Sequence, residues 1–96
     1  MVFSLGRISL YLSDKPSSLK EKRRVVKSLK DRIRARFNIS ISEVDNQDLW
    51  QRSTLGIALV CPNRKQAQTI SDKIIEFIRE AKKVEIIDHD FIIENH

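Results

Sequence analysis

The sequence predicts an α+β fold in which two helices cover one face of a four-stranded antiparallel sheet. Two stretches carry apolar residues at helical spacing, and four others show the two-residue alternation of strands. They follow one another in the order βαββαβ with short connections. With right-handed crossovers, this order is typical of a ferredoxin-like two-layer sandwich. We expect residues 1–96 to form one such domain, because a chain of 96 residues can bury a single modest core.

The first strand is expected over Val2–Ser13. In its second half, the large apolar residues Ile8, Leu10 and Leu12 alternate with more polar ones. Phe3 and Leu5 have the opposite phase, which predicts a bulge or twist near Gly6. The sheet face not covered by helices is expected to show small, mostly polar residues. They are Arg7, Ser9, Tyr11, Ser40, Ser42, Gly56 and Ala58.

The first helix is the most distinctive stretch. Ser18 is expected to cap it, with Glu21 completing a capping box, and the helix runs to about Phe37. Residues 19–37 hold nine of the eighteen Lys and Arg residues, against two acidic ones. The cations opposite the apolar stripe are Lys20, Arg23, Arg24, Lys27 and Arg34. Lys22 falls inside the apolar arc, so we expect its stem to lie on the core edge and its ammonium to reach outward.

The remaining elements are read in the same way. They are a short strand over Ile39–Val44, a strand over Leu55–Val60, a helix from an Asn63 cap to about Ala81, and a strand over Val84–Glu94. In the last strand the apolar residues expected in one phase are Ile87, Phe91 and Ile93. The connection before the third strand contains Trp50, which either anchors an interface or, more simply, folds back and caps the core or the neighbouring helix end.

Charge is divided unevenly along the chain. Residues 1–39 carry +8 (eleven bases and three acids), and residues 40–96 carry −3 (seven bases and ten acids). This asymmetry indicates an anionic partner or contact between the two halves of different copies. The single cysteine, Cys61, is expected to be a small buried residue in a reducing compartment. The first twelve residues make a poor signal peptide, and no apolar run is long enough to span a membrane.

Three blocks of sequence resemble the YlxP-like proteins, small bacterial domains of unknown function. The blocks are residues 18–29 (SLKEKRRVVKSL), 36–44 (RFNISISEV) and 48–52 (DLWQR). The resemblance implies a ferredoxin-like fold and a cytoplasmic protein. Genes of this family often lie beside genes for ribosome maturation and translation initiation, which implies a ribosomal or RNA partner. The family has no established catalytic residues, so the resemblance assigns none here.

An enzyme is not expected, and neither is a cofactor. Gly6 and Gly56 both lie within strands, so no glycine-rich phosphate loop can be placed, and the two histidines form no recognisable triad. The segment Asp88-His89-Asp90 is a weak metal candidate, since on a strand the two carboxylates face away from the imidazole. Stacking of RNA bases on the open sheet face is also disfavoured, because Tyr11 is the one aromatic residue expected there.

The leading hypothesis is a non-catalytic module that binds RNA, through phosphate contacts from Lys20, Arg23, Arg24, Lys27 and Arg34. The simpler alternative for this face is a solvated helix surface whose last arginines complement the helix dipole. A second hypothesis is a protein-interaction or oligomerising domain. It would use the open sheet face or the edge strand that contains Ile39 and Ile41, or its acidic fourth strand would meet another copy's basic helix.

Overall fold

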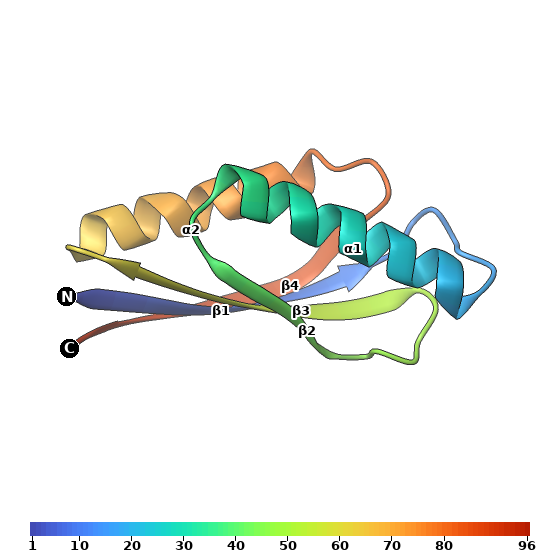
Figure 1. Ribbon diagram of the computed structural model, residues 1–96, viewed down its shortest axis with the longest axis horizontal. Coiled ribbons are helices and arrows are strands. Elements are labelled where there is room, and N and C mark those ends of the chain that lie inside the picture. Colours follow the sequence, from blue (N-terminus) through green and yellow to red (C-terminus); the bar gives the residue numbers. More distant parts are fainter.

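A computed structural model describes residues 1–96 and confirms the predicted fold. The elements are β1 (Val2–Tyr11), α1 (Leu19–Arg36), β2 (Ser40–Asp45), β3 (Arg52–Cys61), α2 (Arg64–Arg79) and β4 (Glu85–Asn95). The strands form one antiparallel sheet in the order β2-β3-β1-β4, and both helices lie on the same side of it (Figure 1). Neither helix combines the length and apolar character needed to cross a bilayer.

Both helices begin at the predicted caps. The Ser18 hydroxyl accepts the Glu21 N–H at 3.1 Å, and Asn63 Oδ1 accepts the Gln66 N–H at 2.9 Å. The reciprocal half of the capping box is shifted by one residue. The Glu21 carboxylate accepts hydrogen bonds from the backbone N–H (2.6 Å) and the hydroxyl (2.9 Å) of Ser17 rather than from the N–H of Ser18.

Glu21 is expected to make stability depend on pH at the acid end. The Ser17 N–H and hydroxyl, helped by the Arg24 charge and opposed by desolvation, hold the pKa of Glu21 below its ordinary 4.5. Such a carboxylate stabilises the fold above the unfolded-state pKa, and this contribution is lost as the pH falls through the folded-state pKa. In urea unfolding at about pH 7 and about pH 3, wild type should therefore lose more stability on acidification than Glu21→Gln. Equal losses in the two proteins would contradict this role.

The core lies between the helices and the sheet. Successive side chains of β1 point alternately toward this core and toward the open face of the sheet. The expected bulge near Gly6 is wrong: β1 pairs with β3 in unbroken register, so Phe3 and Leu5 point to the open face. The core-side positions at this end of β1 are small because α2 lies close above them. The Ser4 and Ser71 hydroxyls are 3.3 Å apart, and the ring of Phe91 fills the space where Gly6 lacks a side chain.

The irregularity falls on β4 instead. Its register with β1 shifts between Ser9 and Leu10, which places Ile86 against the core and leaves Ile87 exposed. The predicted phase was therefore wrong for Ile87 and right for Phe91 and Ile93, both of which pack on the core. A bulge adds one residue to one strand, so side chains on its two sides change phase.

Each edge strand has one backbone carbonyl occupied by an arginine. Arg34 Nη2 donates to the carbonyl of Ile41 on β2 at 3.1 Å, and Arg64 Nη2 donates to the carbonyl of Ile93 on β4 at 2.8 Å. Both edge strands also contain a register irregularity. Charged side chains and bulges are common ways to discourage an edge from pairing with another strand. These contacts disfavour the edge-strand version of the oligomerisation hypothesis.

Candidate nucleic-acid interface

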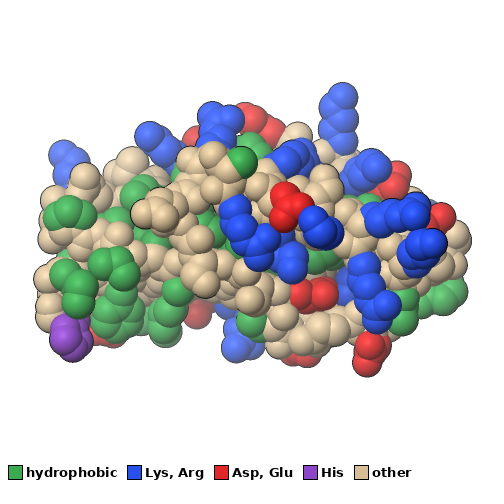
Figure 2. Space-filling view, viewed as in Figure 1, with side chains coloured by type: hydrophobic (Ala, Val, Ile, Leu, Met, Phe, Trp, Pro, Cys, Tyr) green, Lys and Arg blue, Asp and Glu red, His purple; other side chains and the backbone are tan.

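The rotation of α1 is set by its buried residues. Val26, Leu29 and Ile33 face the sheet and are almost completely buried. This orientation turns the opposite arc of the helix to solvent. The predicted binding residues are all exposed: Lys20, Arg23, Arg24, Lys27 and Arg34. Figure 2 shows Lys and Arg side chains gathered over the part of the surface that α1 occupies. The predicted amphipathic arrangement is therefore confirmed.

Two of the five cations are partly engaged within the helix. Asp31 accepts hydrogen bonds from Lys27 Nζ at 2.7 Å and from Arg34 Nη1 at 3.1 Å. The hydrogen bond from Lys27 outweighs desolvation and, with the neighbouring positive charges, holds the pKa of Asp31 below its ordinary value. Arg34 also holds the Ile41 carbonyl on β2. Its guanidinium is therefore less available to a ligand than the sequence indicates.

The other three cations, Lys20, Arg23 and Arg24, form no salt bridge. Lys20 lies in the first turn of α1, where the helix dipole makes a cation unfavourable, and Arg23 and Arg24 follow in the second turn. The alternative that the cations complement the helix dipole accounts for Arg34, in the last turn, but not for these three. The acidic residues of β4 do not reach these three cations. Helix α1 contacts β2, and β4 lies at the opposite edge of the sheet.

Lys22 departs from its prediction. Its side chain is 0% exposed, and its ammonium points inward rather than to solvent. Nζ donates to Glu43 Oε2 at 2.7 Å and to the carbonyls of Asn46 and Gln47, each at 2.9 Å. Ser53 donates to the same Glu43 oxygen at 2.6 Å. Every donor of the ammonium is thus used, and the three hydrogen bonds tie α1 to Glu43 on β2 and to the connection between β2 and β3.

The same connection presents Trp50 to solvent. Trp50 does not cap the core: Trp50 and the adjacent Leu49 are each half exposed, and Trp50 is not among the side chains packed on the core. Both ends of the connection are held in place. Lys22 binds its first residues, and its last, Gln51, accepts the N–H of Leu12 at 2.8 Å. A short segment fixed at both ends cannot bring the indole to the core. The sequence contained no signal for this restraint beyond a lysine in an apolar arc.

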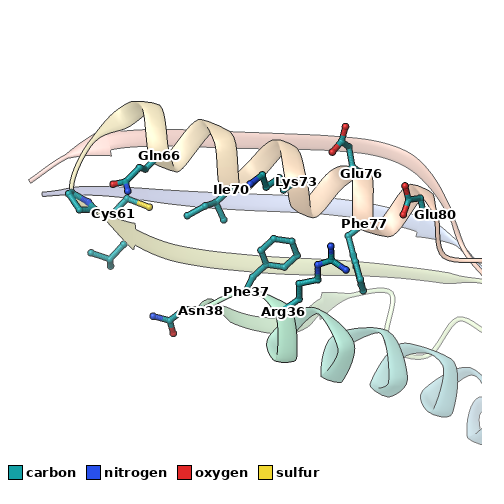
Figure 3. Close-up of a pocket in the computed structure, with 12 residues that line it drawn as sticks. Arg36, Phe37, Asn38, Cys61, Gln66, Ile70, Lys73, Glu76, Phe77 and Glu80 are labelled. Atoms are coloured by element: carbon teal, nitrogen blue, oxygen red, sulfur yellow. The ribbon is translucent and has the colours of Figure 1, made fainter.

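A groove between the end of α1 and α2 was not foreseen. Its volume is about 660 Å³, and Figure 3 shows Arg36, Phe37 and Phe77 converging in it. The two rings meet edge to face with centroids 6.1 Å apart, and the Arg36 guanidinium lies 5.5 Å from the Phe77 ring centroid. Its rim mixes both signs of charge, with Lys73 and Glu76 among the lining residues. The groove therefore favours no particular ligand charge.

The other candidates follow the predicted geometry. Cys61 is buried. Asp88 and Asp90 pair with Ser9 and Arg7 of β1 on the open face, whereas His89 pairs with Ile8 and so points to the helix side. The three side chains of this segment do not converge.

Comparison with known proteins gives a consistent result. The family model described as "Protein of unknown function (DUF503)" matches residues 4–91. The chain is 43% identical over 68 residues to the uncharacterized protein YlxP of Bacillus subtilis (strain 168), covering 71% of this chain and 74% of that protein. A de novo designed protein with a ferredoxin fold, LFR1 1, is structurally similar over 98% of this chain and 84% of its own, with 14% identity and a TM-score of 0.44. The resemblance of the three sequence blocks is confirmed.

Proposed function

We propose that this chain, which belongs to the DUF503 family of proteins of unknown function, is a non-catalytic module that binds RNA through the outer face of α1. The observation that carries the proposal is the group formed by Lys20, Arg23 and Arg24. These side chains are exposed, form no salt bridge and lie in the first two turns of α1. A polyanion stabilises such a group by neutralising it.

The five cations would not contribute equally. Lys20, Arg23 and Arg24 would make the main phosphate contacts, since binding would break no existing ion pair. Lys27 is 75% exposed and could exchange Asp31 for a phosphate. Arg34 would contribute least, because it holds both Asp31 and the Ile41 carbonyl. We propose a ribosomal RNA in the cytoplasm as the natural ligand.

Binding of RNA is expected to weaken steeply with salt. Each single-stranded phosphate that a cation neutralises contributes about −0.7 to the slope of log K against log salt concentration, because counterions are released. Three to four contacts therefore predict a slope of roughly −2 to −3. The measurement is fluorescence anisotropy of a labelled single-stranded RNA titrated with protein at several salt concentrations.

Two results would decide against the proposal. One is an affinity that stays constant as salt rises from about 50 to about 200 mM, since phosphate contacts must respond over this range. The other is complete displacement of the RNA by an equal charge concentration of polyglutamate. That result would show attraction to any polyanion instead of recognition of a nucleic acid.

A further inference from the structure

The open sheet face has an apolar end that the helices do not cover. Phe3 and Leu5 on β1 lie beside Val60 and Ala58 on β3, and Leu5 also lies beside Ile92 on β4. Leu5, Val60 and Ile92 are 48%, 69% and 50% exposed. Figure 2 shows hydrophobic side chains gathered below the sheet, at the end of the molecule where both chain termini lie in Figure 1. A contiguous group of large apolar side chains is typical of an interaction surface.

The same face contains a hollow next to these large side chains. Ala58 on β3 is small and lines a depression of about 370 Å³ between Leu5 on β1 and Val44 on β2, whose side chain lies over Gly56. At the level of Leu5, the face is therefore raised on β1 and β4 by Leu5 and Ile92 and is low on β3 at Ala58. A surface with a protrusion and a depression on opposite sides of one strand can be complementary to itself.

Charge differs between the two sides of the face. The open side of β4 carries Glu85, Asp88, Asp90 and Glu94, whereas Arg52 lies on β3 and Arg7 lies on β1, beside Asp90. Arg52 and Glu85 both pair with Tyr11, so they occupy the same level along β1 on opposite sides of it. A two-fold rotation about an axis along β1 exchanges these two sides. It would bring Arg52 of one copy opposite Glu85 of the other.

We infer that the open sheet face is the interface of a homodimer, with its two-fold axis running along β1. Leu5 packs against Leu5 of the second copy, and Ile92 of each copy enters the hollow at Ala58 of the other. Arg7 of the two copies also meet on the axis, each beside Asp90 of its own β4. Arg52 and Glu85 form a reciprocal pair across the axis at the far end.

This dimer is independent of the proposed RNA binding. The helices lie on the opposite side of the sheet, so face-to-face packing would leave both α1 surfaces exposed on the outside of the dimer. A dimer through the open face should also persist at high salt, because the contacts at its Leu5 end are apolar. An association between the basic helix and the acidic β4 of another copy would instead dissociate.

The first test is the mass in solution by sedimentation velocity, from low-micromolar to submillimolar protein at low and high salt. Wild type should reach twice the 11.2 kDa monomer mass under both conditions. Leu5→Asp and Ile92→Asp should each raise the dimer dissociation constant at least about tenfold, because a carboxylate would be buried unpaired. Leu49→Asp is the matched control, since Leu49 has the same 50% exposure as Ile92 but lies outside the face. Circular dichroism should confirm that all three variants fold.

The second test concerns the axis. Arg52→Glu and Glu85→Arg should each weaken the dimer by like-charge contact across the axis, and the double variant should restore it. A wild type that stays monomeric at every concentration would overturn the inference, as would Asp variants that dimerise like wild type. A double variant no tighter than the single ones would overturn the proposed axis. Ile92→Asp should leave the RNA affinity unchanged, because the open face is on the other side of the sheet from α1. A negative result in the dimer tests would therefore not count against the proposed RNA binding.

Discussion

Replacing Lys22 with methionine is expected to lower the free energy of unfolding by roughly 3–5 kcal/mol, the cost typical of breaking a buried ion pair from one side. Methionine can fill the space of the aliphatic stem but donates no hydrogen bond. The substitution would leave the Glu43 carboxylate without its cation, and the Asn46 and Gln47 carbonyls without a donor. The connection between β2 and β3 would then lose its attachment to α1.

Urea unfolding would measure this loss. Trp50 is the only tryptophan and lies in the affected connection, so its fluorescence should respond along with far-ultraviolet circular dichroism. Lys20→Met is the matched control, because it makes the same change at an exposed position two residues earlier and should alter stability by less than about 0.5 kcal/mol. In a double-mutant cycle, Glu43→Gln should cost less in the Lys22→Met background than in wild type. A Lys22→Met protein as stable as the control would refute the role of the buried ammonium.

Reversing the three unpaired cations of α1 is expected to separate RNA binding from stability. In the triple variant Lys20→Glu, Arg23→Glu and Arg24→Glu, phosphate contacts become repulsive. We expect the affinity for single-stranded RNA to fall roughly a hundredfold and the salt slope to flatten by about 2. An acidic residue in the first turn suits the helix dipole, whereas Arg24→Glu removes a favourable charge near Glu21, so the fold should be about as stable as wild type. Anisotropy and urea unfolding on the same preparations would report both quantities.

The control for this variant carries an equal change of charge on α2. Lys65→Glu, Lys73→Glu and Arg79→Glu also reverse three exposed cations, and each reversal lowers the net charge by two, so both triple variants fall from +5 to −1. Only a few-fold loss is expected for the α2 variant, through long-range electrostatics. Equal losses in the two variants would mean that RNA responds to net charge alone, and would remove α1 as the interface.

The candidate site was predictable in part. Helical spacing alone placed the five cations on one arc, because residues three and four apart share a helix face whatever surrounds it. Which cations remain unpaired depended on Asp31, on the same helix, and on the carbonyl of Ile41, which lies on the edge strand β2. Lys22 was recognised as unusual for its position, but its inward direction depended on Glu43, 21 residues away.

The order of the elements, the helix caps and the direction of the basic face can be predicted from the amino-acid sequence. Each follows from residues that are close together along the chain, where backbone geometry sets which side chains share a face. Three features are visible only in the folded chain: Phe3 and Leu5 face outward, β4 has a bulge at Ile87, and Trp50 is half exposed. These features depend on how closely α2 approaches Ser4 and on where distant strands come into register. Such long-range distances leave no periodic pattern in the sequence.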